Sequence, residues 1–187
     1  MEYKQTAYGA GDEIIEVLIL DEPMNGTLVG MISSPMFSEN VALALDSRVA
    51  KGEEVDYDLA CMGAAKDGSI PRIYLFPDLV LDLKAGSIEA LFILFHELGH
   101  YVNGDLSGDY CSEDYDTQRV ECVKDGKVSA KELAADAFAA KYIGRDKAII
   151  GLEALLKRTQ HSWNIEEFDE ESVKTAIKEI EMRINLL

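Results

Sequence analysis

The sequence predicts an α+β protein with a small β-sheet in its N-terminal half and helices in its C-terminal half. Two observations predict this division. Short runs rich in Ile, Val and Leu, bounded by turn residues, occur in the first half, whereas the last third is rich in alanine and has helical periodicity. The 187 residues contain no repeat and no Pro/Ser-rich linker. We therefore expect a single domain over residues 1–187, long enough to bury its own core.

Two β-strands are expected at the start of the chain. Residues 13–20 (EIIEVLIL) are dense in β-branched and aliphatic side chains and are followed by Asp-Glu-Pro, which favours a turn. Residues 27–32 could then form the hairpin partner. Residues 39–50, with their Ala and Leu content and polar flanks, predict a helix after Ser38. Residues 58–66 predict a second short helix or a turn.

The next segment carries a proline. Residues 72–81 (RIYLFPDLVL) have the composition of a strand. Because proline cannot donate a hydrogen bond to a neighbouring strand, this strand should lie at a sheet edge or end near Pro77. Residues 74–76 could then pair with an extended peptide, or they could simply form one edge of the sheet.

Five segments follow, and four of them are predicted to be helical. Residues 88–102, behind an N-cap at Gly86-Ser87, predict a helix that is apolar on every side and therefore buried. Residues 106–127 are acidic and lack a period. Because they also lack the spacing of a calcium loop, we expect a solvated surface segment. The amphipathic or alanine-rich segments 129–143, 145–159 and 170–184 predict the remaining helices.

The net charge of the chain limits the kinds of partner that it can bind. Asp and Glu number 35 against 18 Lys and Arg, which gives a formal charge of −17. Such a chain repels polyanions, so we expect neither a nucleic-acid partner nor an anionic membrane surface. The start of the sequence lacks the pattern of a signal peptide, and the apolar runs are too short to cross a bilayer. We expect a cytoplasmic protein whose cysteines, Cys61, Cys111 and Cys122, are free thiols. If the protein were exported, Cys111 could pair with Cys122.

The buried helix contains the motif His96-Glu97-Leu98-Gly99-His100. Histidines at i and i+4 project from one helix face, so both rings can reach a single Zn²⁺ ion. Glu97 is then placed to take a proton from water rather than to bind the metal. The alternative is that two histidines near a helix C-terminus are simply favoured by the helix dipole.

A catalytic zinc ion takes three protein ligands, and Glu132 is the best candidate for the third. Asp136 lies one turn further along the same helix, where it could accept a hydrogen bond from a ligating histidine. Residues 129–132 also form a capping-box pattern, in which Glu132 would only bond to the backbone at its own helix start. His161 and Tyr142 are candidate donors to a reaction oxyanion by residue type alone.

The motifs resemble a known family. Residues 96–105 (HELGHYVNGD) are similar to the H-E-x-x-H-x-x-N-G-D signature of the HtpX and CaaX-prenyl-protease type of zinc metallopeptidase. Residues 132–136 (ELAAD) are similar to the second motif of that family, E-x-x-A-D. The likeness covers about residues 73–143, and Met182-Arg183-Ile184 is weakly similar to the C-terminus of the family. The chain lacks the membrane helices of the family, and its motifs are closer together. A soluble version with a short gap is also similar to the ImmA/IrrE metallopeptidases.

This resemblance implies a zincin-like domain that hydrolyses peptide bonds. His96, His100 and Glu132 would bind Zn²⁺, Glu97 would be the general base, and Asp136 would support a ligand. The partner would be a peptide or protein substrate. Two alternatives stay open: a regulatory protease of the ImmA/IrrE type that cleaves a repressor of a phage or mobile element, and a non-catalytic protein whose metal only joins helices. The sequence leaves the oligomeric state undetermined.

Overall fold

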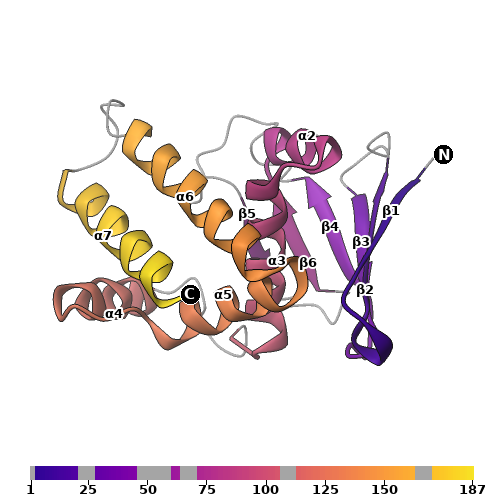
Figure 1. Cartoon of the computed structure of the whole chain (residues 1–187), viewed down its shortest axis with the longest axis horizontal. Helices are drawn as coiled ribbons and strands as arrows, with labels where there is room; N and C mark the ends of the chain where they lie inside the picture. The colour runs from indigo at the N-terminus through magenta and orange to yellow at the C-terminus, as the bar shows by residue number, and fades with distance from the viewer. Residues whose placement is uncertain (1–2, 21–27, 46–59, 64–70, 106–112, 163–169) are drawn as a thin grey trace.

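A computed structural model of the chain describes residues 3–20, 28–45, 60–63, 71–105, 113–162 and 170–187. Within these ranges the protein has the predicted α+β class, with a sheet on one side and the helices gathered on the other (Figure 1). No helix of the described part is both long and apolar enough to cross a membrane.

In the described part of the chain, the sheet has six strands in the order β1-β2-β3-β4-β6-β5. The pairs are antiparallel except for β4 and β6, which run parallel. The predicted hairpin is confirmed, because β2 and β3 pair antiparallel where strands were expected at 13–20 and 27–32. A short 3₁₀ turn, Gly11–Glu13, joins the first two strands. The strands are β1 (Tyr3–Tyr8), β2 (Ile15–Leu20), β3 (Leu28–Ser33), β4 (Val41–Leu45), β5 (Ala60–Gly63) and β6 (Arg72–Leu75).

The predicted helix at 39–50 is wrong, because its described part contains strand β4. Residues 41–44 are all buried, since the strand lies inside the sheet between β3 and β6. A strand buried on both faces shows no alternation of polar and apolar residues, so its pattern resembles that of a buried helix. The described part of 58–66 is likewise a strand, β5, and not a short helix.

The segment around Pro77 was expected to be a strand that lies at a sheet edge or ends near Pro77. The second alternative is confirmed, since strand β6 ends at Leu75, but residues 77–81 are not part of a strand: Pro77 is the first residue of α2 (Pro77–Ala85). Proline suits this position because the first residues of a helix have no intrahelical partner for their N–H groups. β6 is not an edge strand, since β4 pairs with it on one side and β5 on the other. The expected pairing of residues 74–76 with a peptide is therefore excluded.

The C-terminal half is helical, as predicted, but it contains one more helix. The acidic segment 106–127, expected to be an irregular excursion, contains α4 (Glu113–Lys124). Asp109 and Cys111 lie outside the described residues. The possible disulfide between Cys111 and Cys122 therefore lies outside them too. Cys122 itself is a free thiol. The other helices are α3 (Ile88–Val102), α5 (Ala130–Ile143), α6 (Arg145–Ser162) and α7 (Glu170–Leu186).

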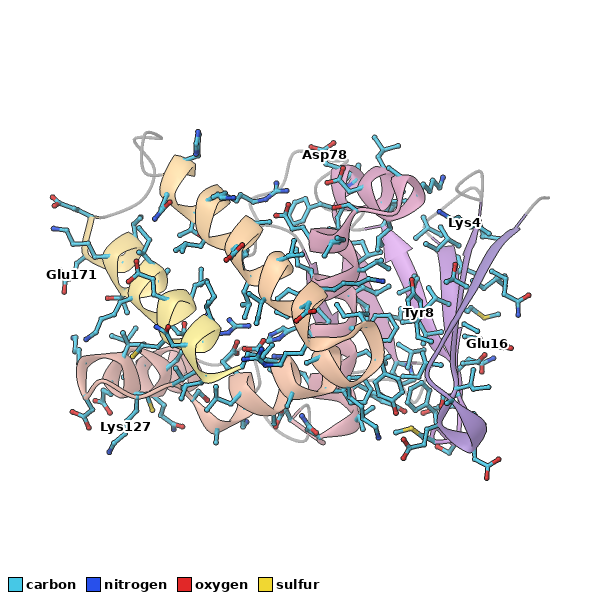
Figure 2. The ribbon with its side chains drawn as sticks, viewed as in Figure 1. Lys4, Tyr8, Glu16, Asp78, Lys127 and Glu171 are labelled. Carbon is cyan, nitrogen blue, oxygen red and sulfur yellow. The ribbon has the colours of Figure 1, made fainter. Side chains whose placement is uncertain are left out.

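Helix α3 forms the centre of the core, with the predicted bounds. Ser87 caps its start by accepting a hydrogen bond from the N–H of Ala90. The helix contacts β5 and β6 of the sheet as well as α2, α5 and α6. Tyr8 of β1 packs edge-on against Phe95 of α3, with ring centroids 4.8 Å apart. Many charged side chains lie at the periphery, among them the labelled Glu16, Asp78, Lys127 and Glu171 (Figure 2).

Candidate metal centre

Helices α3 and α5 approach each other very closely beside the HExxH motif. A Cβ atom added to Gly99 would lie 2.8 Å from the Cα atom of Ala135 and 3.0 Å from its carbonyl oxygen. Gly99 lies between His96 and His100 on α3, and Ala135 precedes Asp136 on α5. Small residues at the contact therefore let the backbones meet at the point where the polar side chains face each other.

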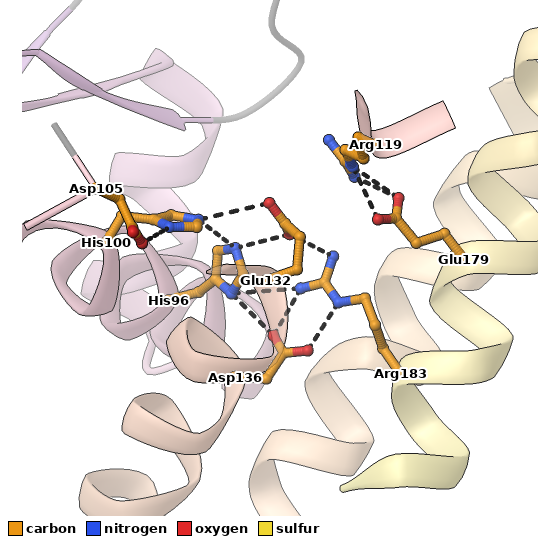
Figure 3. A network of polar contacts seen from close by, with 8 residues as sticks. All are labelled: His96, His100, Asp105, Arg119, Glu132, Asp136, Glu179 and Arg183. Atoms are coloured by element: carbon orange, nitrogen blue, oxygen red, sulfur yellow. Dashed lines mark hydrogen bonds and ion pairs between the residues drawn. The ribbon is translucent and has the colours of Figure 1, made fainter. Parts of the chain in front are cut away.

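His96, His100 and Glu132 together form a buried group of three potential metal ligands. The two Nε2 atoms of the histidines lie 3.1 Å apart. Oε2 of Glu132 lies 3.4 Å from Nε2 of His96, and Oε1 lies 3.7 Å from Nε2 of His100 (Figure 3). Ligand atoms about 2.0–2.2 Å from a tetrahedral metal would be about 3.3–3.6 Å apart, and the separation of each Nε2 atom from a Glu132 oxygen is close to that value, with a different oxygen facing each histidine. This group could hold a metal ion.

The ring of His96 is oriented by Asp136, as the sequence predicts. Nδ1 of His96 lies 2.8 Å from Oδ1 of Asp136, and the carboxylate is fully buried. A carboxylate accepts hydrogen bonds, so Nδ1 carries a proton, and in the neutral ring that would bind a metal Nε2 presents its lone pair towards the ligand group.

His100 has an equivalent partner, Asp105, which was not among the site residues expected from the sequence. Nδ1 of His100 lies 3.0 Å from Oδ2 of Asp105. Gly104, with φ of +74°, ends α3 in a Schellman turn, in which Asp105 N–H bonds to the carbonyl of His100 and Gly104 N–H to that of Tyr101. The turn after the motif therefore returns an acidic side chain to the second histidine. An acidic residue directly after Asn-Gly was the available signal.

Arg183 of α7 is a further member of the cluster that the sequence reasoning did not assign. Its side chain is buried, and its guanidinium contacts both Asp136 and Glu132. The signal for it was weak: a basic residue on the buried face of an amphipathic helix, 47 positions after its partner Asp136. Such a partner is found only when the packing of α7 against α5 is known.

The buried charges shift the acidities of the group. Burial opposes ionisation of Glu132, yet Arg183 and His96 hold the pKa of its carboxyl well below the usual value. Burial disfavours the imidazolium form of His96, but hydrogen bonds to Asp136 and Glu132 outweigh it and raise the pKa to about 9. Burial and the charge of His96 lower the pKa of His100. In the absence of a metal, one histidine is therefore charged at neutral pH and the other is neutral.

This asymmetry predicts a pH-dependent metal affinity. Because a metal binds only neutral imidazole, each ion must displace the proton of His96, whose pKa is raised to about 9. The apparent affinity should rise about tenfold per pH unit between about pH 6 and pH 8. Competition titrations with a chelator of known pH dependence would measure this slope. An affinity that does not change with pH in that interval would contradict the shift.

The capping box at the start of α5 lacks one of its two bonds. The Ser129 side chain makes no capping hydrogen bond. The Glu132 side chain is buried against His96, His100 and Arg183.

The remaining predicted residues lie in different places. Glu97 is half-buried on α3, directly after His96. Tyr142 donates its hydroxyl hydrogen to the sulfur of Met36, 2.9 Å away, and packs among aromatic rings. His161 is exposed on α6, where Nδ1–H donates to the carbonyl of Lys157. Neither of the two suggested oxyanion donors is part of the described cluster.

Comparison with family models, with curated proteins and with solved structures finds no significant match to this chain. The class that the described structure defines is an α+β protein with a buried His-His-Glu group able to hold a metal ion.

Proposed function

We propose that the chain is a zinc-dependent metallopeptidase, with His96, His100 and Glu132 as metal ligands. The observation that carries the proposal is the arrangement of two imidazole nitrogens and a carboxylate within 4.8 Å of one another. Two histidines and one carboxylate are a ligand set typical of catalytic zinc, whereas structural zinc sites are usually closed and rich in cysteine. The resemblance of residues 96–105 and 132–136 to metallopeptidase motifs supports the same function.

Each residue of the site has its own role in the proposed hydrolysis of a peptide bond. A bound zinc ion supplies Lewis acidity, which polarises a carbonyl oxygen and lowers the pKa of water. Glu97 accepts the proton of the attacking water and passes it to the amine nitrogen as the carbon–nitrogen bond breaks. Asp136 and Asp105 keep the protons of His96 and His100 on Nδ1.

We assign the peptide-binding edge to β5 in place of β6. β5 is the last strand of the sheet, and it pairs with β6 on one side only among the described strands. It also contacts α3, the helix that carries Glu97. An extended peptide that added to β5 by main-chain hydrogen bonds would run beside that helix.

Reconstitution tests this function. The purified protein is stripped with a chelator, loaded with zinc, and incubated with a mixture of peptides derived from a whole proteome. We expect cleaved products, read by mass spectrometry, only in the zinc-loaded sample, because metal-assisted hydrolysis needs the ion. A protein that binds zinc but cleaves no peptide would favour the non-catalytic alternative, in which the metal joins α3 to α5.

A further inference from the structure

The guanidinium of Arg183 lies between two carboxylates of one helix. Nε and Nη2 donate to Oδ2 and Oδ1 of Asp136 over 2.7 and 2.6 Å. Nη1 lies 3.1 Å from Oε2 of Glu132 (Figure 3). Arg183 is only 2% exposed, Glu132 3% and Asp136 0%. The three charged groups therefore interact with little screening by water.

The planar shape of the guanidinium matters in this arrangement. The N–H groups of a guanidinium point in fixed directions within one plane. Two of them can donate to the two oxygens of one carboxylate, and another N–H group remains to donate to a second carboxylate. Glu132 and Asp136 lie one turn apart on α5, so their like charges repel each other when both are buried. Arg183 offsets this repulsion and fixes the rotation of both carboxylates at once.

The effect of Arg183 extends to a histidine through Asp136. Nη2 of Arg183 and Nδ1 of His96 both donate to Oδ1 of Asp136, over 2.6 and 2.8 Å. A carboxylate held by the arginine therefore presents this oxygen to His96 in one orientation. The ring of His96 and the carboxylate of Glu132 are two of the three potential ligands.

We propose that Arg183 is a positioning residue of the metal centre, which orients the Glu132 carboxylate directly and the His96 ring through Asp136. This inference rests on the proposed zinc site. Helix α7 would then be an integral part of that site, although it carries none of the proposed ligands.

A second effect of the arginine has the opposite sign. The positive guanidinium repels a bound cation and draws electron density from Glu132, which alone would weaken metal binding. Orientation and charge can be separated by substitution. Arg183→Lys keeps the charge but loses the planar fork, whereas Arg183→Met loses both and keeps much of the apolar stem.

The experiment measures zinc affinity by competition with a chromophoric chelator, so it does not depend on activity. If Arg183 positions the ligands, both Arg183→Met and Arg183→Lys should weaken zinc binding by about 10–100-fold, as the loss of residues that orient ligands does elsewhere. The cobalt-substituted variants should also show an altered visible absorption spectrum, because the ligand geometry is changed.

The control is Glu179→Gln on the same helix. Glu179 is equally buried one turn before Arg183, and it pairs with Arg119 of α4 over 2.7 Å. Its replacement should lower the stability of the metal-free protein and leave zinc affinity unchanged. Such a result separates the docking of α7 from the orientation of the ligands.

Two results would overturn the inference. Zinc binding as tight as in the wild type, or tighter, in both Arg183 variants would show that the arginine orients nothing that the metal needs. Zinc affinity equal to that of the wild type in Arg183→Lys, but not in Arg183→Met, would show that zinc binding needs the positive charge and not the planar guanidinium. Should Arg183→Met fail to fold by circular dichroism, Arg183→Lys carries the test, because it keeps the buried charge. A wild-type protein that takes up no zinc would contradict the proposed function itself, and this inference with it.

Discussion

Replacement of Glu97 by glutamine is expected to leave zinc bound and to reduce peptide cleavage by about 10²–10⁴-fold, the usual contribution of a general base. Glutamine has nearly the same shape as glutamate but cannot accept a proton from water at neutral pH. His96, His100 and Glu132 are untouched by the change, so the metal content should remain that of the wild type. The measurement is the initial rate of peptide cleavage at matched zinc occupancy.

A matched control for this variant lies on the same helix. Glu89, near the start of α3, pairs with Arg158 of α6 over 2.8 Å and has no contact with the ligand group. Glu89→Gln makes the identical chemical change, so it should retain cleavage. Unchanged turnover in Glu97→Gln would remove Glu97 from the role of general base, and loss of zinc in that variant would indicate a ligand instead.

Removal of the Glu132 side chain is expected to have the largest effect on the metal. Glu132→Ala deletes the only carboxylate of the proposed ligand set and leaves two histidines. Zinc affinity should fall by more than about 100-fold, beyond the 10–100-fold typical of residues that only orient ligands. Inductively coupled plasma analysis after gel filtration would report the lost zinc, and competition titration would give the affinity.

The same variant also tests the capping alternative. If Glu132 only capped its helix, its removal would lower the free energy of unfolding by about 1 kcal/mol and leave metal binding unchanged. Glu153→Ala, an exposed glutamate on α6, controls for the removal of one negative charge from an acidic protein. Full zinc occupancy in Glu132→Ala would return Glu132 to a structural role.

The HExxH helix could be predicted closely from the sequence because its signals are local. A capping serine, an unbroken apolar run and an Asn-Gly stop define α3 within the chain itself, and the structure has the predicted bounds. The i, i+4 spacing of His96 and His100 likewise needs no tertiary information. From its position one turn after Glu132, Asp136 was expected to accept a hydrogen bond from a ligating histidine, and in the structure that histidine is His96.

Other elements and contacts depend on how distant parts of the chain pack together, so local sequence patterns did not predict them. Strand β4 is buried on both faces by neighbours from elsewhere in the chain, so its own sequence lacks a strand period. β5 is four residues long, too short for a pattern to be established. Helix α4 is acidic, and among its residues 117–124, whose burial the structure describes, Val123 alone is buried. The contact of Arg183 with Asp136 joins residues 47 positions apart and arises only when α7 packs on α5.

The contact of Gly99 with Ala135 has a consequence for how related chains could be found. Any side chain at Gly99 would press on the backbone of α5, so the fourth letter of the HExxH motif is restricted by helix packing and not by metal chemistry. A search pattern that required glycine there, and a small residue just before the aspartate of the second motif, would describe the spacing of two helices. It would exclude chains that carry the same histidines by chance, since those have no neighbouring helix to accommodate.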